Sequence, residues 1–191
     1  MKYRVETREH EFNPGEVAKV TGVSTSLQRD WRRRKVTSGK TSQGWNKYSL
    51  SEVIRMSVMR AFTQSGISLE TADLVSSLAV LPVMDELVHW EDVAVFKGDT
   101  LSSEQMDKAR DRFVSGASGD DQFTFVALPE QKGTASASRI KNLADGESIL
   151  GRSDNFYGIV LDHSLLAHRI AGLSTLPLIE FIVTVTEDRN G

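Results

Sequence analysis

Residues 13–49 read NPGEVAKVTGVSTSLQRDWRRRKVTSGKTSQGWNKYS and contain two short helical patterns followed by a polar, glycine-containing segment. Asn13 is a favourable residue for capping the start of the first helix. Gly22 suits the left-handed backbone conformation that ends a helix and begins a tight turn. Ser24 or Thr25 then caps the second helix. The spacing therefore predicts two helices that meet at a turn around Gly22.

The second of these helices has one apolar side and a strongly basic end. Leu27 and Trp31 are four residues apart, so they share a helix face and are predicted to point toward the core. Arg29 and the run 32–35 (RRRK) supply the positive charge. A short turn between two helices, with cations on the second, is typical of a DNA-binding helix-turn-helix.

The segment after the second helix is almost entirely polar, and Gly39 and Gly44 are its turn residues. Trp45 and Tyr48 are its large apolar side chains, which predicts a short hairpin anchored to the core by these two aromatics. Two further helices are predicted beyond it. One begins after Ser49 and ends at Gly66, and the next begins after Ser68 and ends near Pro82.

The second half of the chain predicts a mixture of strands and helices. Helices are expected at 83–90, 103–114, 138–144 and 164–173, strands at 122–127, 155–161 and 178–184, and a loop within 133–152. This order predicts an α+β protein in which a helical winged helix-turn-helix, residues 1–80, precedes a small α/β domain, residues 81–191, with parallel pairing as one option.

Composition narrows the class of protein. The 191 residues include no cysteine, which excludes disulfides and zinc-thiolate sites and fits a reducing cytoplasm. No apolar stretch approaches the roughly 18 residues that a membrane-spanning helix needs, and the first residues lack the apolar core of a signal peptide. We therefore expect a cytoplasmic protein with no membrane partner.

Charge is unevenly distributed along the chain, whose net charge is −3. Residues 1–75 hold 13 Lys and Arg against 8 Asp and Glu, whereas residues 76–191 hold 10 against 18. The first part is therefore +5 and the remainder −8. A basic segment favours a polyanionic partner, and the acidic remainder would be repelled by it.

Enzymatic and metal sites find little support in the sequence. Four histidines are spread through the chain, and His163 and His168 would lie on different helix faces. Asp162, His163 and Ser164 contain the residue types of a hydrolase triad, but sequence neighbours cannot form its geometry. No phosphate-binding glycine loop occurs. We therefore expect no catalytic activity, no metal and no cofactor.

The order of several short motifs over residues 12–72 resembles the winged helix-turn-helix of MerR-type transcriptional regulators. The matching elements are Gly15-Glu16-Val17-Ala18, Gly22-Val23-Ser24, Arg29-Asp30-Trp31, Gly44-Trp45 with Tyr48-Ser49, and Gly66-Ile67-Ser68-Leu69. The resemblance ends near residue 80, and the family's long dimerising coiled coil is not evident. Asn46 stands where the family's wing usually has arginine.

The resemblance implies that the second helix enters the major groove of double-stranded DNA, that the wing lies on the phosphate backbone, and that the protein is a homodimer. Arg29 matches the family's DNA-contacting arginine. Gln28 could recognise adenine, while Lys40 and Lys47 would meet phosphates. The full set of candidate DNA-binding residues is Ser24, Thr25, Gln28, Arg29, Arg32, Arg33, Lys40, Lys47 and Tyr48.

We therefore expect a sequence-specific regulator of transcription that binds promoter or operator DNA. Two alternatives stay open at this point. One is an excisionase-like or architectural factor that bends DNA. The other is a sensor or adaptor whose residues 81–191 do the main work. That second part could dimerise the protein, bind a small molecule or bind another protein, because its apolar strands need burial in every case.

Overall fold

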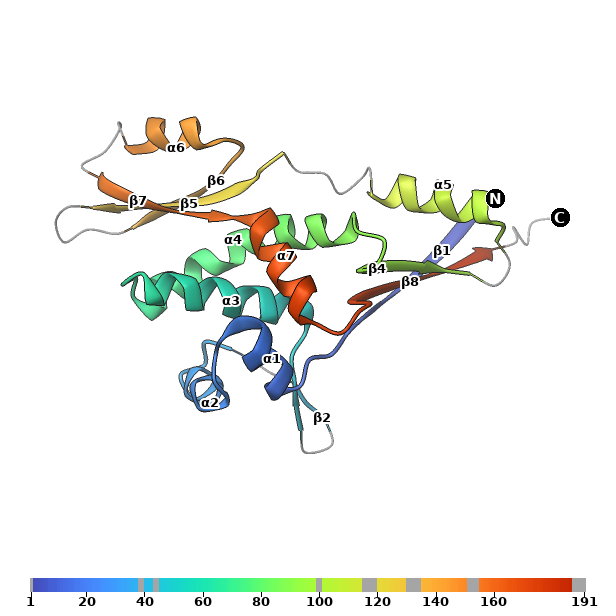
Figure 1. Ribbon diagram of the computed structural model, residues 1–191, viewed down its shortest axis with the longest axis horizontal. Coiled ribbons are helices and arrows are strands. Elements are labelled where there is room, and N and C mark those ends of the chain that lie inside the picture. The colour runs from blue at the N-terminus through green and yellow to red at the C-terminus, as the bar shows by residue number, and fades with distance from the viewer. Residues whose placement is uncertain are drawn as a thin grey trace.

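The computed structural model describes residues 2–37, 40–42, 45–98, 101–114, 120–129, 135–150 and 155–186. The first half of the chain is mainly helical and the second half mixes helices with strands (Figure 1). Three small sheets are present in the described part of the chain, with strand orders β1-β8-β4, β2-β3 and β6-β5-β7. The α+β fold class is confirmed.

The predicted pair of helices forms at the N-terminal end as α1 (Pro14–Thr21) and α2 (Thr25–Arg33). Asn13 caps α1 in a capping box, because its side chain accepts from the N–H of Glu16 while the Glu16 carboxylate accepts from the N–H of Asn13. Gly22 has φ 73°, the left-handed conformation in which glycine avoids the steric penalty of a Cβ. Ser24 caps α2, so these local predictions are confirmed.

Two longer helices, α3 (Leu50–Gln64) and α4 (Leu69–Val88), follow and pack against each other. Ser49 and Ser68 cap them as predicted, and Ser49 forms a capping box with Glu52. The predicted end of α4 near Pro82 is wrong, since the helix continues through this proline to Val88. A proline inside a helix costs about 3 kcal/mol, and the packing of α4 against α3 and α7 outweighs that cost.

The predicted hairpin is present as β2 (Lys40–Ser42) and β3 (Trp45–Lys47), which pair antiparallel. It is fastened to the start of α1 by a bridge between Phe12 and Tyr48, whose backbone groups exchange two hydrogen bonds of 2.9 Å. Both of these aromatic side chains are buried. In Figure 1 the hairpin projects from the same end of the molecule as α1 and α2.

The two ends of the chain meet in one sheet, which the sequence did not predict. Strand β1 (Lys2–Glu9) pairs antiparallel with β8 (Ile179–Thr186), and β4 (Ala94–Lys97) pairs parallel on the other side of β8. Helix α5 (Ser103–Val114) follows β4 and was predicted correctly. The strand expected at 178–184 is β8, but it lies in a different sheet from the other two predicted strands.

Those other strands are β5 (Phe123–Pro129) and β7 (Asn155–Asp162), which pair antiparallel with each other. The helix predicted at 138–144 is wrong, because β6 (Ser136–Ile140) completes this sheet and α6 (Leu143–Leu150) follows it. The alternation of small and polar residues in β6 suits an edge strand that is mostly exposed. The loop expected within 133–152 therefore contains a strand and a helix.

Helix α7 (His163–Leu173) connects the second sheet to β8 and packs on both α1 and α4. Its buried residues join one apolar cluster that includes Phe12 near the start of the chain, Val83 in α4 and Phe181 in β8. The predicted domain boundary at residue 80 falls within α4. The division of the chain into domains stays a prediction, and the helix-turn-helix and the tail share a core.

Candidate nucleic-acid interface

The turn between α1 and α2 is held by a buried glutamine. The Gln28 side chain is 1% exposed, and its Nε2 donates hydrogen bonds of 2.9 Å to the backbone oxygens of Pro14 and Val23. These bonds tie α2 to the start of α1 and to the turn. The prediction that Gln28 recognises adenine does not fit this burial. Gln28 lies three residues before Trp31, on the same inward helix face, and that spacing was the signal in the sequence.

The opposite side of α2 is exposed and polar. Ser24, Thr25 and Arg29 lie at its N-terminal half, and the Nε of Arg29 donates to the backbone oxygen of Thr25 at 3.2 Å. Arg33 continues this row, since residues 25, 29 and 33 are spaced four apart. Ser26 belongs to the same surface, with its Oγ 2.9 Å from that of Ser24, although the sequence analysis did not select it. This row could contact base edges.

The basic end of α2 is partly neutralised within the helix itself. Asp30 forms ion pairs with Arg33, at 2.5 Å to Nη2, and with Arg34, at 2.9 Å to Nε. Arg29 and Lys35 are exposed in this surface. Lys35 has φ 61°, a left-handed conformation that costs a non-glycine residue roughly 1–2 kcal/mol. The chain reverses at Lys35, and its side chain is thereby placed at the edge of a hollow.

That hollow has a volume of about 450 Å³ and is called the basic hollow below. It lies where α2 ends against α3 and α4, and it is lined by Arg32, Lys35, Val36, Thr37, Arg55 and Asp73. Arg55 of α3 is ion-paired with Asp73 of α4. The lining therefore carries three cationic groups and one carboxylate. Arg55 and Thr37 were not among the predicted contacts. Arg55 is brought here by the packing of α3 against α4, where it pairs with Asp73, and Thr37 follows the end of α2.

Two polar atoms of residues that line the basic hollow are buried without a hydrogen-bond partner in the described part of the chain. They are Nη1 of Arg32 and Oγ1 of Thr37. Burying a polar donor without a partner costs about 1–3 kcal/mol, so such atoms commonly mark a place where a ligand or water completes the bonding. A guanidinium and a hydroxyl both donate hydrogen bonds, which suits an anion such as phosphate.

The hairpin carries three of the predicted DNA contacts, Lys40, Lys47 and Tyr48, and one of them does not fit its position in the structure. In its register Lys40 faces Lys47, so the two lysines share one face of the hairpin, although the side chains of Lys40 and Trp45 lie outside the described residues. Lys47 is half-buried. Tyr48 is 1% exposed, so the prediction that it contacts DNA does not fit its position. Its role as a core anchor is borne out.

The pKa of Tyr48 depends on its burial and on two charged side chains near it. Burial raises the pKa of Tyr48, the Arg32 guanidinium opposes that rise, and the Glu52 carboxylate adds to it. Tyr48 is therefore a neutral, buried phenol near Arg32. Arg32, one of the predicted contacts, is thus placed between the core aromatic of the hairpin and the basic hollow.

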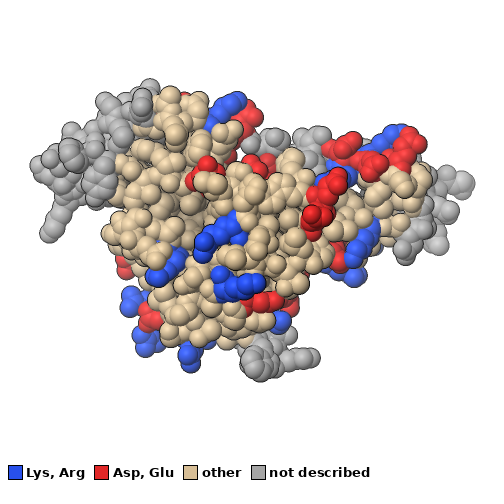
Figure 2. All heavy atoms as spheres, viewed as in Figure 1, with Lys and Arg blue, Asp and Glu red and all other residues tan. Residues whose placement is uncertain are grey.

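Charge on the visible face of the molecule follows the division seen in the sequence. Figure 2 shows Lys and Arg around the end that carries α1, α2 and α3, whereas Asp and Glu are denser toward α5 at the opposite side. A surface with this distribution attracts a polyanion to its helix-turn-helix end. The α2 row and the basic hollow both belong to that end.

The catalytic trio considered in the sequence has structural roles. Asp162 caps α7, with its Oδ1 accepting from the N–H of Leu165 at 2.9 Å. His163 is buried, with Nε2 2.8 Å from the Thr124 Oγ1 and Nδ1 3.0 Å from the Asp121 backbone oxygen. Burial lowers the pKa of His163, which keeps the ring neutral.

Among the residues that the structure describes, no group of three or more His, Asp or Glu side chains is arranged to hold a metal ion. Over the same residues, no helix has the length and apolar character to cross a membrane.

Comparison with protein families gives one match. Residues 12–77 match the model of the MerR HTH family regulatory protein, which covers α1, α2, the hairpin, α3 and about half of α4. No curated protein matches the sequence. The match identifies a DNA-binding helix-turn-helix of the kind found in transcriptional regulators, as the motifs had indicated. The N-terminal segment of this chain, residues 12–77, therefore belongs to the MerR helix-turn-helix family.

Proposed function

We propose that the protein is a sequence-specific regulator of transcription that binds promoter or operator DNA through α2. The observation that carries the proposal is the exposed row Thr25, Arg29 and Arg33 on the helix whose C-terminal end lines the basic hollow. The row would enter the major groove, where an arginine can donate two hydrogen bonds to guanine. The basic hollow would seat a backbone phosphate, which fixes the register of the row on the bases.

The β2–β3 hairpin is the wing in this proposal, and Lys40 with Lys47 would meet the phosphate backbone. Homodimerisation on an inverted repeat follows from the family resemblance and belongs to the same proposal. The proposed contacts to DNA are Ser24, Thr25, Arg29, Arg32, Arg33, Lys40 and Lys47. Gln28 and Tyr48 position the contacting elements from the interior, because both are buried.

The test is selection of DNA by the full chain from a random pool, followed by binding titrations of the enriched sequence at several salt concentrations. We expect an enriched motif and an affinity that falls steeply with salt, because lysine and arginine contacts release counterions from the phosphates. Enrichment of a two-fold symmetric motif would support the dimer. A pool that stays random while the protein remains folded would contradict sequence-specific binding.

A further inference from the structure

Strand β1 lies at the edge of the β1-β8-β4 sheet, and β8 is its only strand partner in the described part of the chain. Figure 1 shows this sheet at the end of the molecule away from α2. The side chains of residues 4–9 of β1 are all exposed. An edge of this kind leaves a row of backbone donors and acceptors open to another strand. The side of β1 that faces away from β8 is called the β1 edge below.

Alternate residues of β1 present their backbone groups at the β1 edge, because in an antiparallel pair every second residue points these groups toward the partner strand. The N–H of His10 donates to the Leu178 oxygen at 2.8 Å. The hydroxyl of Thr184 donates to the Arg4 oxygen at 3.4 Å. The even-numbered residues therefore face β8, and the odd-numbered residues, with Val5 among them, point N–H and C=O groups to the β1 edge.

The side chain of Val5 is exposed on a face of the sheet that is otherwise buried. Val5 lies opposite Val183, and residues directly opposite each other share a face of the sheet. Val183 and Phe181, two residues away on the same face, are buried, whereas Val5 is 39% exposed. A further strand at the β1 edge would therefore cover Val5 from its open side.

The other face of β1 carries charges of alternating sign. Arg4, Glu6 and Arg8 are two residues apart and share this face. Within the strand, the Nε of Arg8 lies 3.1 Å from the Glu6 Oε1. If a second β1 ran antiparallel with Val5 opposite Val5, Arg4 of each copy would lie opposite Glu6 of the other. Opposite charges at such positions stabilise an antiparallel pair, so β1 is complementary to itself in this register.

The other two-fold registers are less favourable. A pairing centred on Arg4 or on Glu6 would place that residue opposite its own copy, so that like charges would lie together. A pairing centred on Thr7 would also bring opposite charges together, but it would set Glu9 opposite Val5 on the face that is otherwise apolar. The register centred on Val5 avoids both problems.

We propose that the β1 edge is a homodimer interface, in which residues 3–7 of two copies pair antiparallel about a two-fold axis at Val5. Lys2 and Arg8 lie outside the paired segment. The pairing joins two sheets into one, with the strand order β4-β8-β1-β1-β8-β4. An interface that uses the same surface on both copies closes, so assembly stops at the dimer. The proposal rests on the homodimer of the proposed function and assigns its interface.

The first experiment measures the mass of the full chain by analytical ultracentrifugation over a range of concentrations, without DNA. We expect a monomer–dimer equilibrium. Val5→Pro should weaken dimerisation at least tenfold, because proline lacks the N–H that Val5 presents at the β1 edge, while the N–H groups that face β8 are kept. The matched control Val5→Thr keeps this N–H and a β-branched side chain, and it should dimerise within threefold of the unmodified protein.

The second experiment tests the register by exchanging charge. Arg4→Glu and Glu6→Arg each set like charges opposite each other, so each variant alone should dimerise at least tenfold more weakly. An equimolar mixture of the two should recover the dimer, because each chain then supplies the charge that the other needs. The control pair is Lys108→Glu and Glu104→Lys on α5, which should dimerise like the unmodified protein both alone and mixed.

A chain that stays monomeric at every soluble concentration would overturn the proposal. A dimer that persists in folded Val5→Pro, or charge variants that do not recover the dimer when mixed, would overturn it as well. If Val5→Pro fails to fold, the mixture still decides. None of these measurements contains DNA. A dimer that binds no DNA would therefore contradict the proposed function alone, and a monomer that binds the selected DNA would contradict the β1 interface alone.

Discussion

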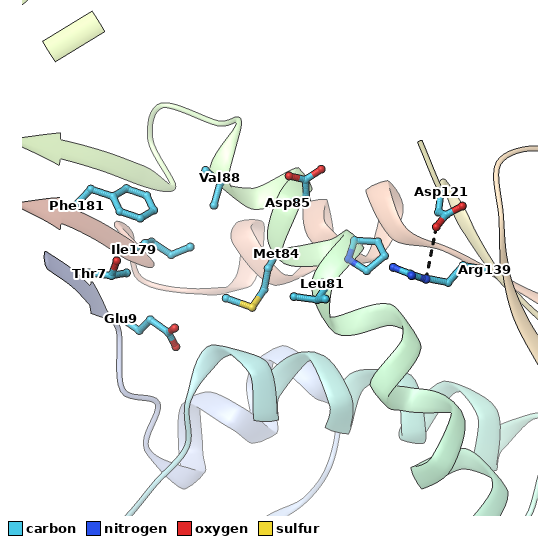
Figure 3. A pocket seen from close by; sticks show the side chains of 11 residues that line it. Thr7, Glu9, Leu81, Met84, Asp85, Val88, Asp121, Arg139, Ile179 and Phe181 are labelled. Carbon is cyan, nitrogen blue, oxygen red and sulfur yellow. Dashed lines mark ion pairs between the residues drawn. The ribbon is translucent and has the colours of Figure 1, made fainter. Parts of the chain in front are cut away.

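The two halves of α4 border two hollows of nearly the same volume, about 450 and 440 Å³. Asp73, in the first half of α4, lines the basic hollow. Leu81, Met84 and Val88, in the second half, line the other, which is called the acidic hollow below (Figure 3). Three cationic side chains and one carboxylate line the basic hollow, and three carboxylates and one guanidinium line the acidic hollow. One helix therefore separates a mainly cationic lining from a mainly apolar lining that also carries acidic groups.

The difference arises from what α4 packs against. Its first half lies beside α3, which supplies Arg55, and next to the basic end of α2. Its second half lies beside β1 and β8. The residues of β8 that line the acidic hollow, Ile179 and Phe181, are apolar, and their partners on β1 are Glu9 and Thr7. Size alone says little about what a hollow binds, and the charge and polarity of the lining decide it.

The largest expected effect comes from reversing the charge of two residues that line the basic hollow. Arg32→Glu with Lys35→Glu should lower DNA affinity by about a hundredfold or more, because two proposed phosphate contacts of roughly 1–2 kcal/mol each become repulsive. Fluorescence anisotropy of labelled DNA measures this affinity.

The matched control for that variant is Lys108→Glu with Lys141→Glu, which makes the same change in net charge at exposed sites of the tail. DNA affinity should fall by only a few-fold, through the long-range field. A loss as large as that of the Arg32/Lys35 variant would mean that the basic hollow has no special role.

The next effect concerns the exposed row of α2 rather than the basic hollow. Arg29→Ala should weaken binding to the selected sequence by about 1–3 kcal/mol, the range for a good base or charged contact. The loss should be larger on the selected sequence than on random DNA, since a base contact confers discrimination. Gel-shift titration on both DNAs measures it, and an unchanged affinity for the selected sequence would remove Arg29 from the interface.

The local structure of the helix-turn-helix was predictable because it depends on neighbouring residues. Asn13, Gly22, Ser49 and Ser68 cap or end helices through backbone groups within four positions in the sequence. The inward position of Gln28 was also readable, since it shares a face with Trp31. The prediction that Gln28 contacts adenine requires an exposed side chain, and the helix geometry places this side chain on the inward face.

What could not be predicted depends on contacts between distant segments. The pairing of β1 with β8 joins residues 2–9 to residues 179–186, and nothing in either strand specifies its partner. Arg55 enters the basic hollow through the packing of α3 and α4, again over a long separation. Local propensity predicts a helix end at Pro82, because it cannot include the packing against α3 and α7 that offsets the cost of the proline.

A smaller effect tests whether Gln28 stabilises the fold from the interior or contacts a base. Gln28→Leu should lower the free energy of unfolding by about 1–3 kcal/mol, because it removes the two hydrogen bonds that tie α2 to the backbone oxygens of Pro14 and Val23. Chemical denaturation measures this change, with Gln64→Leu at an exposed helix end as the control. DNA affinity of the folded variant should fall less than Arg29→Ala. A larger loss with unchanged stability would restore Gln28 as a base contact.

The smallest effect is the pH dependence of stability that comes from His163, a buried histidine near the acidic hollow. The Nδ1 of His163 lies 3.0 Å from the backbone oxygen of Asp121, whose carboxylate lines the acidic hollow, while no histidine is found in the lining of the basic hollow as described. Burial lowers the pKa of His163 in the folded state, and Arg139 adds to this. The Asp121 backbone hydrogen bond and the Asp162 and Asp121 carboxylates oppose the shift.

The sign of the pH effect follows from that shift. Below the unfolded pKa of about 6.5 the unfolded chain takes up a proton that folded His163 resists, so stability is full above this pH and declines as the pH falls. Urea denaturation between pH 7.5 and pH 5 should therefore show a weaker decline in His163→Gln than in the unmodified protein, with exposed His168→Gln as control. An unchanged slope in His163→Gln would show that other groups set the acid sensitivity of the fold.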